Sequence, residues 1–594
     1  MDAGALREKY RIERDKRLRP DGNDQYLEPT GRFADLLDDP YTPVVDRAPV
    51  RGEVTVAVIG AGFSGLAVGA RLKQAGIDDV RLIDKAGDVG GVWYWNRYPG
   101  AMCDTAAMIY LPMLEEAGTV PSAKYVHAPE IHAHAKRIAT TFGLYDGALL
   151  STGITEVVWD DESSRWIIRT DRGDELRARH VTMGTGPLHR PKLPGIPGLH
   201  DFAGHAFHTS RWDYAYTGGD PSGAPMTGLA DKRVGIIGTG ATAVQCIPHL
   251  AATAGELLVF QRTPSSIDVR ANHAIDPDWF ASLEPGWQRR WLHNFATLQT
   301  GGFADEDLVM DGWTDIAQRI RDRVVALVEG GAPFDADTMR RAYEESDDEK
   351  MTEIRARVDE IVTDPATAEA LKPWYRQLCK RPCFHDEYLQ AYNRPNVRLV
   401  DTDGQGVERI DATGVWVDGT HYELDCLIFA SGFEVGTGLA RRSGFEVTGR
   451  DGVTLTDYWA DGMRTFHGIH VNGFPNLSIV SIAQNGSLIS NVTHNHVESA
   501  DAIAAVIAHA EAIGATEVEV TSEAEQAWLD RIASGVTTVF GDPDCTPGYY
   551  NNEGQPFDEA TRQSQSRFPE GPVAFFEYLE AWRISGEFAG LDYR

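Results

Sequence analysis

The chain twice repeats the same order of apolar, glycine-rich and amphipathic segments. In the first copy a continuous apolar run at 54–59 leads into the glycine-rich turn 60–65, and an amphipathic stretch follows as far as Gly76. Uninterrupted apolar runs are typical of parallel strands buried on both faces, and a strand that turns through glycines into a helix is the unit that binds a dinucleotide. We therefore predict a strand at 54–59, a helix at 66–74 and a second strand at 80–83.

The second copy begins with an apolar strand at 233–237. The glycine-rich turn 238–243 follows, and then a helix and a further strand at 257–260. This copy closes on the apolar strand and glycine of 427–433, as the first copy closes at 183–186. Two such units predict two separate nucleotide-binding sheets.

One position distinguishes the two copies chemically. Asp84 lies 24 positions after Gly60, and Arg262 lies 24 positions after Gly238, so both stand at the end of the second strand. A carboxylate there accepts hydrogen bonds from ribose hydroxyls, whereas a guanidinium accommodates a 2′-phosphate. We therefore expect FAD at the first site and NADPH at the second. A solvated charge at a strand end is the alternative for Arg262.

The second copy is also the longer one. Its first and last glycines are 194 positions apart, against 126 in the first copy, and the surplus falls at 275–375. Apolar residues recur there at three- and four-residue spacing, most clearly at 315–328 and 349–362, which indicates helices. We expect a helical insertion that borders the substrate cleft. The mixed-charge stretch 7–19, ended by Pro20, predicts a solvated helix.

These patterns predict an α/β fold with two dinucleotide-binding, Rossmann-type domains, the NADP domain being inserted in the FAD domain. After the second copy the chain should return to the first sheet, with a strand at 477–482. The predicted parts are an N-terminal extension (1–51), the FAD-binding domain in two parts (52–186, and 434–594 with a C-terminal lid), the NADP-binding domain in two parts (187–274 and 376–433), and the helical insertion (275–375).

Composition restricts the classes of partner. The 594 residues carry a net charge of -32, which disfavours nucleic acid and anionic membranes, and no apolar run approaches the about 18 residues of a membrane span. The N-terminus lacks the apolar core of a signal peptide. The six cysteines are scattered, so we expect reduced thiols in a cytoplasmic protein, and the close pair Cys379 and Cys383 predicts no metal site. No obligate protein partner is expected.

A third motif lies between the two glycine signatures. The chain fits the spacing F-x-G-x-x-x-H-x-x-x-W-[PD] through Phe202, Gly204, His208, Trp212 and Asp213. This pattern is the fingerprint of the type I Baeyer–Villiger monooxygenases, which the chain resembles over nearly its whole length. Within that family it looks most like the members with a long N-terminal arm that act on bulky ketones. An incidental surface linker is the alternative.

The resemblance implies the chemistry. Family members use FAD, NADPH and O2 to insert one oxygen atom beside a ketone carbonyl, through a flavin peroxide that must stay anionic, so the site needs a fixed cation and must exclude water. The segment around Lys380-Arg381 resembles the one that brings a Lys-Arg pair to the cofactors. Arg381 is therefore the expected catalytic cation, Asp104 the residue that orients it, and Lys380 a partner of Arg262 at the 2′-phosphate. A solvated pair of charges is the alternative for Lys380 and Arg381.

By resemblance, the cofactor contacts fall on the two glycine turns and on the segments that face them. The expected FAD contacts are Gly60, Gly62, Phe63, Ser64, Gly65, Asp84, Val92, Trp93, Tyr94, Trp95, Asp104, Tyr110, Ile154 and Val492. The expected NADP contacts are Met102, Cys103, Asp104, Gly238, Thr239, Gly240, Ala241, Thr242, Ala243, Arg262, Thr263, Lys380, Arg381 and Tyr549. Core packing is an equal alternative for Trp93 and Trp95.

Two further segments have expected roles. His208 and Trp212 should form a hinge between the domains, with His208 as a structural hydrogen bonder rather than a proton donor. The C-terminal stretch 547–554 lacks the Trp that small-ring members carry, with Tyr549 as the nearest substitute, and the loop 486–492 should close over the flavin. Together with the long arm, this favours a bulky cyclic or polycyclic, terpenoid-like ketone.

Other classes of protein share parts of this pattern. Flavin enzymes that oxygenate nitrogen or sulfur have both nucleotide domains but a Tyr or Phe in place of Trp212. A non-catalytic flavoprotein that binds NADPH would have no need for Arg381 with Asp104. A disulfide reductase is rejected because Cys103 has no neighbouring cysteine in the sequence.

Overall fold

The computed structural model describes residues 2–435, 437–486, 489–535 and 545–594. Its larger sheet has the strand order β18-β4-β5-β6-β2-β3, and β19 pairs with β6. The strands of this sheet are β2 (Arg51–Ile59), β3 (Val80–Ile83), β4 (Ile154–Asp160), β5 (Arg165–Thr170), β6 (Glu175–Met183), β18 (Val447–Thr448) and β19 (Leu477–Ile479). The predicted strands at 54–59 and 80–83 are confirmed. The strand predicted at 477–482 ends at Ile479, because its partner β6 ends at Met183.

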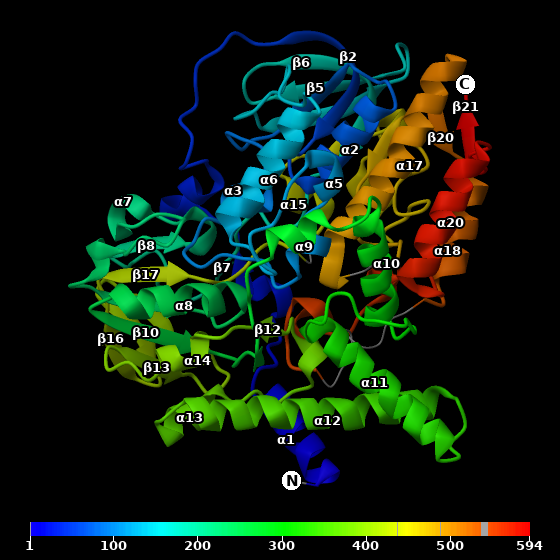
Figure 1. The fold of residues 1–594 in the computed structure, drawn as a ribbon. Helices are drawn as coiled ribbons and strands as arrows, with labels where there is room; N and C mark the ends of the chain where they lie inside the picture. The colour runs from blue at the N-terminus through cyan, green and yellow to red at the C-terminus, as the bar shows by residue number, and fades with distance from the viewer. Residues whose placement is uncertain (1, 436, 487–488, 536–544) are drawn as a thin grey trace.

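The second sheet is entirely parallel, in the order β13-β10-β9-β17-β8. Its strands are β8 (His205–His208), β9 (Arg233–Ile237), β10 (Glu256–Gln261), β13 (Val397–Asp401) and β17 (Cys426–Phe429). All five lie between β6 and β18 in the chain, so this domain is inserted in the first one. Figure 1 shows it to the left of the larger sheet, with α8 (Ala241–Thr253) against it.

Helices join and cover the first sheet. The crossover from β2 to β3 is α2 (Phe63–Gln74), which packs against the long C-terminal helix α17 (Val492–Ile513). On its other side α2 contacts α6 (Ala128–Thr141). The shared core is apolar and includes Leu66 and Ile503, so burial of one face of each helix holds this layer together.

The extra residues of the second copy, 275–375, form helices, as predicted. They contain α9 (Pro277–Ala281), α10 (Trp287–Gln299), α11 (Gly312–Glu329), α12 (Ala336–Ile361) and α13 (Pro365–Leu371). Asp311 and Thr314 form a capping box that begins α11. Figure 1 shows α12 lying across one end of the molecule with the N-terminal helix α1 (Ala3–Asp15) against it.

The N-terminal helix differs from its prediction. It spans Ala3–Asp15 rather than 7–19, and Leu6, Tyr10 and Glu13 on one of its faces are buried. The Tyr10 hydroxyl accepts a hydrogen bond from Arg355 of α12 at 3.2 Å, and Arg7 pairs with Glu344. The expectation of a solvated helix is therefore wrong for this face, because several of its charges meet partners on other elements.

The cysteines also differ from their prediction. Cys379 and Cys545 form a disulfide between residues 166 positions apart, with Cα atoms 5.1 Å from each other. Cys103, Cys246, Cys383 and Cys426 are free and buried. The expectation of six reduced thiols is wrong because the fold brings the segment before Lys380 against the C-terminal loop. Within the described ranges, every helix is too short or too polar to cross a membrane.

Candidate functional site

Gly60 and Gly65 of the first glycine turn leave no room for a side chain. A Cβ on Gly60, whose φ is +105°, would lie 2.4 Å from the carbonyl oxygen of Gly184, and a Cβ on Gly65 would lie 1.8 Å from that of Gly60. The turn passes directly to α2, whose N-terminus attracts phosphate. Gly91 faces the turn, since its Cβ would approach the Gly62 Cα within 2.6 Å. These glycines fit the pyrophosphate of a dinucleotide.

Asp84 stands at the position expected for ribose recognition. It follows β3, and its carboxylate accepts hydrogen bonds from the amides of Ala61 at 2.6 Å and Ala86 at 2.8 Å. Burial raises the pKa of Asp84. The carbonyl of Asp84 also accepts from the Thr152 amide at 2.9 Å, which brings Ile154, two residues later, to the same edge of the sheet. A carboxylate beside the glycine turn fits an unphosphorylated ribose, as FAD has.

The predicted aromatic contacts separate into two groups. The Trp93 Nε1 donates to the Tyr110 hydroxyl at 2.8 Å, and the Phe63 ring lies edge-on to Tyr110 at 6.2 Å, so these three form one cluster at the start of α2. Tyr94 and Trp95 are instead buried in a separate small core. Their side chains pack into the protein, as the alternative of core packing for Trp95 allows.

That small core joins three parts of the chain. It includes Tyr41 of the N-terminal extension, and the Arg211 guanidinium lies over the Trp95 ring at 4.0 Å. Arg211 is buried, and burial lowers its pKa to about 10. Because Arg211 belongs to the fingerprint segment, this cation–π contact connects that segment to the FAD domain.

The start of α17 closes this side of the site. The Asn491 side chain donates to the Ile109 carbonyl at 2.9 Å, and the Thr493 hydroxyl donates to the Tyr110 carbonyl at 2.6 Å. Val492 lies between them, at the N-terminus of a 22-residue helix whose dipole favours negative charge there. Residues 487–488 of the predicted flavin-covering loop lie outside the described residues.

The second turn repeats the geometry of the first. Gly238 has a φ of +114°, and its Cβ would lie 2.6 Å from the Ala430 carbonyl oxygen. Gly240 is the N-cap of α8, so Ala241, Thr242 and Ala243 form the first turn of that helix. The Thr239 hydroxyl donates to the Thr263 carbonyl at 2.6 Å, which joins the turn to the end of β10. The turn and the adjacent cation Arg262 fit a 2′-phosphorylated nucleotide.

Arg262 is held by both ends of the chain. Its Nη1 donates to the Gln25 side chain at 2.5 Å, and its Nη2 lies 3.6 Å from the Glu553 carboxylate. Lys380 contacts the same C-terminal loop, where its Nζ donates to the Pro547 carbonyl at 3.3 Å. The alternative of a fully solvated charge does not fit Arg262, whose side chain is 27% exposed and has partners on both sides.

The predicted catalytic pair forms a bidentate ion pair. The Arg381 Nε donates to Asp104 Oδ2 at 3.0 Å and its Nη2 donates to Oδ1 at 2.6 Å, although the two residues are 277 positions apart. Burial disfavours the charged guanidinium, but the Asp104 carboxylate outweighs this, and the pKa of Arg381 is raised well above its ordinary value. Arg381 is therefore a permanent cation with a fixed direction.

The insertion contributes a wall to this pair. The Arg381 guanidinium lies over the Trp313 ring of α11 at 5.1 Å, and the Trp313 Nε1 donates to the Asp104 carbonyl at 3.3 Å. Tyr549 lies near enough for the Arg381 charge to oppose the rise that burial causes in its pKa. Local sequence patterns gave no reason to single out Trp313.

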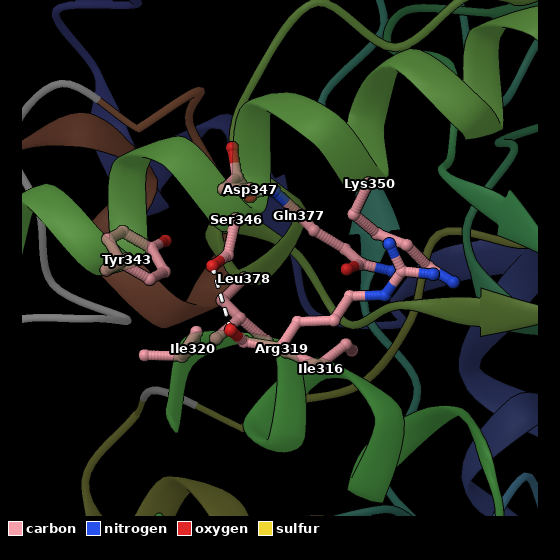
Figure 2. A pocket seen from close by; sticks show the side chains of 9 residues that line it. All are labelled: Ile316, Arg319, Ile320, Tyr343, Ser346, Asp347, Lys350, Gln377 and Leu378. Carbon is pink, nitrogen blue, oxygen red and sulfur yellow. Dashed lines mark hydrogen bonds between the residues drawn. The ribbon is translucent and has the colours of Figure 1, made fainter. Parts of the chain in front are cut away.

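The segment that leads to Arg381 is fixed by α12. Asp347 accepts hydrogen bonds from the Gln377 amide at 2.8 Å and from Arg376 Nη1 at 3.2 Å. Asp347 lines a crevice of about 10 Å³ between α11 and α12. Figure 2 shows its side chain there with Gln377 and Leu378 beside it. Burial raises the pKa of Asp347 to about 7. The disulfide at Cys379 anchors the same segment from its other side.

Two buried residues near Asp104 were missed by sequence reasoning. Gln245 of α8 donates to the Met102 carbonyl at 2.8 Å and accepts from the Tyr98 hydroxyl at 3.0 Å, so it attaches the segment of Met102 and Cys103 to the NADP domain. Arg270 is buried, and although burial lowers its pKa, the Asp104 charge opposes that change. Nothing in the local pattern distinguishes either residue from core or surface polar residues.

Three of the fingerprint residues, Phe202, His208 and Trp212, are buried at one edge of the second sheet, where β8 pairs with β17. The His208 Nδ1 lies 2.8 Å from the Ser210 hydroxyl, and burial, with the nearby Arg211 charge, lowers the pKa of His208 to about 3. A histidine that is neutral at physiological pH fits a structural role better than proton donation. Trp212 donates to the Thr217 hydroxyl at 3.2 Å.

The other three fingerprint positions have structural contacts as well. Phe202 is buried, and a Cβ on Gly204 would lie 2.5 Å from its ring. Asp213 lies 2.9 Å from His205 and caps the short helix that follows. The motif therefore builds the edge of the NADP domain, and its proposed hinge motion stays a prediction.

Known proteins resemble this chain over its full length. Residues 58–119 match the model of the NAD(P)-binding Rossmann-like domain. Neopentalenolactone D synthase of Streptomyces avermitilis is 52% identical, with all of both chains covered, and a Baeyer–Villiger monooxygenase of Streptomyces coelicolor is 50% identical over 97% of this chain and 95% of its own. The solved polycyclic ketone monooxygenase of Thermothelomyces thermophila superposes with a TM-score of 0.91 and 38% identity, over 100% of this chain and 99% of its own. The chain therefore belongs to the Baeyer–Villiger monooxygenases, flavoenzymes that use FAD, NADPH and O2.

Proposed function

We propose that this enzyme inserts one oxygen atom into a bulky cyclic or polycyclic ketone of terpenoid type and so forms a lactone. The names of the relatives support this substrate class, since one is a neopentalenolactone D synthase and a solved neighbour is a polycyclic ketone monooxygenase. The long N-terminal arm and a C-terminal loop without Trp favour a large substrate as well.

The single observation that carries the proposal is the bidentate pair of Arg381 and Asp104. When bound, FAD supplies the activation of O2 after NADPH has supplied a hydride. Arg381 provides a fixed positive charge for the negative charge that develops on oxygen, and Asp104 holds its guanidinium in one direction. Trp313 covers the pair and excludes water from one side.

The two nucleotide sites take their proposed roles from the two turns. We assign FAD to the turn 60–65 with Asp84, and NADPH to the turn 238–243 with Arg262, Thr263 and Lys380. Two cations and a hydroxyl group are suited to a 2′-phosphate, because Arg262 and Lys380 can pair with its charge and Thr263 can donate a hydrogen bond.

The remaining assignments concern the whole protein. We propose a cytoplasmic enzyme whose partners are the ketone and O2, without nucleic acid, membrane or an obligate protein partner. The six-part division of the chain at residues 51, 186, 274, 375 and 433 is likewise proposed.

Product mass spectrometry tests this function. The enzyme is incubated in air with NADPH and, in separate reactions, a macrocyclic ketone, a fused polycyclic cyclopentanone, cyclohexanone and an aryl sulfide. We expect a gain of one oxygen with lactone fragmentation on the two large ketones. Oxygenation of the sulfide alone would favour a nitrogen- or sulfur-oxygenating enzyme, and negligible NADPH consumption in every reaction would favour a non-catalytic flavoprotein.

A further inference from the structure

The N-terminal arm, residues 2–27, reaches the proposed NADPH site from outside both nucleotide domains. It begins as α1 beside α12 and continues through a short 3₁₀ helix at Gly22–Gln25. It then ends as the strand β1 (Tyr26–Leu27), which pairs antiparallel with Leu193–Pro194 at the entry to the NADP domain. Figure 1 shows α1 beneath α12, far from the larger sheet. The arm therefore follows the nucleotide-binding side of the inserted domain.

Arg17 of this arm contacts the two residues that follow β10. Its Nε donates to the Arg262 carbonyl at 3.0 Å and lies 3.2 Å from the Thr263 hydroxyl. The Arg17 side chain is only 7% exposed, and Glu13 Oε2 accepts from its Nη1 at 2.8 Å. A buried arginine with these partners has a fixed position.

Gln25, later in the arm, meets Arg262 from the other direction. Its side-chain oxygen accepts from Arg262 Nη1 at 2.5 Å, and Tyr26 follows with its hydroxyl 3.5 Å from Nη2. Asn23 donates to Asn552 of the C-terminal loop at 2.8 Å. The arm and the C-terminal loop thus enclose the Arg262 guanidinium between them.

Three cations and two carboxylates meet around this point: Arg17, Arg262 and Lys380 against Glu13, which pairs with Arg17, and Glu553. Burial, followed by the charges of Arg262 and Arg17, lowers the pKa of Lys380 to about 8, so the three cations lie within electrostatic reach of one another. Glu553 is the carboxylate beside Arg262, at 3.6 Å. Across the described part of the chain, no carboxylate oxygen lies within 4.0 Å of the Lys380 ammonium. In a protein with a net charge of -32, such a cluster is suited to an anion.

We propose that the N-terminal arm is part of the NADPH site, where Arg17 adds a third positive charge to the 2′-phosphate pocket and Gln25 holds the Arg262 guanidinium in place. This inference rests on the proposed function, which puts the 2′-phosphate at Arg262, Thr263 and Lys380. It gives the arm a role in selecting NADPH over NADH rather than in ketone recognition.

Equilibrium binding of two nucleotide fragments tests the proposal without turnover. The FAD-loaded enzyme is titrated with 2′,5′-ADP and with 5′-AMP, which differ by the 2′-phosphate. Arg17→Met keeps an unbranched side chain as far as the position of Nε and removes the guanidinium with its charge, so we expect its preference for 2′,5′-ADP to fall roughly tenfold, with 5′-AMP binding unchanged. Arg262→Met is the positive reference. Arg11→Met is the matched control, because Arg11 belongs to the same N-terminal arm, within α1, but is 53% exposed.

The outcomes separate the two proposals. An unchanged preference in Arg17→Met, with a reduced preference in Arg262→Met, would refute the role of the arm and leave the nucleotide site intact. An unchanged preference in both variants would overturn the placement of the 2′-phosphate and with it this inference. If Arg17→Met loses its flavin absorbance through misfolding, Gln25→Leu replaces it, with an expected threefold fall that an unaltered preference would contradict.

Discussion

Replacing Asp104 by Asn removes the negative charge beside Arg381 and keeps the size of the side chain. The wild-type carboxylate accepts two charge-assisted hydrogen bonds, at 3.0 and 2.6 Å, and Asn can accept only one of them. Hydrogen bonds to charged groups contribute about 1.5–3 kcal/mol each. Arg381 would also lose the attraction that raises its pKa and fixes its direction.

The expected effect is a loss of coupling between NADPH oxidation and lactone formation. A stabilisation of about 1.5–3 kcal/mol corresponds to a factor of roughly 10 to 100 in rate. The loss should not exceed the roughly 100- to 1000-fold that removing a charge-stabilising group itself costs, because Asp104 acts through Arg381. Asp104→Asn should therefore keep its FAD and oxidise NADPH, with hydrogen peroxide formed in place of most of the lactone.

The assay measures lactone and hydrogen peroxide per NADPH consumed, on the best ketone of the substrate panel. Asp425→Asn is the matched control, since Asp425 forms a bidentate pair with Arg233, at 3.1 and 2.9 Å, on the exposed edge of the NADP domain. Wild-type coupling in Asp104→Asn would refute the positioning role. So would an equal loss in the control, because the effect would then be one of general stability.

Three further predictions concern the segment around Arg381. Burial lowers the pKa of Lys380 to about 8, so the KM for NADPH should rise above about pH 8 as the ammonium loses its charge. Lys380→Arg should remove that rise, and parallel KM–pH curves for wild type and variant would contradict the 2′-phosphate role. Cys545→Ser removes a disulfide that links residues 166 positions apart, for which chain entropy gives a stabilisation of up to about 5 kcal/mol. Residues 545–554 should therefore exchange their amide hydrogens faster than in wild type, and an unchanged exchange rate would contradict this. Burial raises the pKa of Asp347 from 3.8 to about 7, so its proton stabilises the fold fully below about pH 4 and this contribution disappears as the pH rises to 7. Relative to wild type, the free energy of unfolding of Asp347→Asn should therefore increase by up to roughly 4 kcal/mol between pH 4 and pH 7. Urea unfolding at the two pH values measures it, and the same difference between variant and wild type at both would contradict the prediction.

Local patterns predicted the strands and glycine turns of the two proposed nucleotide sites. The strands at 80–83 and 233–237 match β3 and β9, because a buried parallel strand is apolar at most of its positions and needs no distant partner to be identified. The glycines of both turns were equally visible, since the backbone conformations and close approaches at Gly60 and Gly238 exclude a side chain whatever surrounds them.

Pairs that are distant in the chain were visible only through the family resemblance or not at all. Arg381 and Asp104 were matched to family motifs, but spacing alone offers no reason for two residues 277 positions apart to meet. The Cys379–Cys545 disulfide had no such motif, and scattered cysteines were taken as reduced. Asp347 resembles any other acid of a charged helix until its burial against Gln377 is known.

The N-terminal arm shows why charge patterns mislead in such cases. A helix rich in both signs is usually solvated, because its charges satisfy each other at three- and four-residue spacing. Glu13 and Arg17 do pair at four-residue spacing, with Arg17 just beyond the end of α1, but the pair is buried, and the Arg17 Nε reaches the Arg262 carbonyl and the Thr263 hydroxyl. Pairing within a helix lowers the cost of burying its charges, so the pattern that predicts a solvated surface is equally compatible with a charged contact to another domain. Only the position of the partner domain shows whether such a segment is a solvated surface or a contact with another domain.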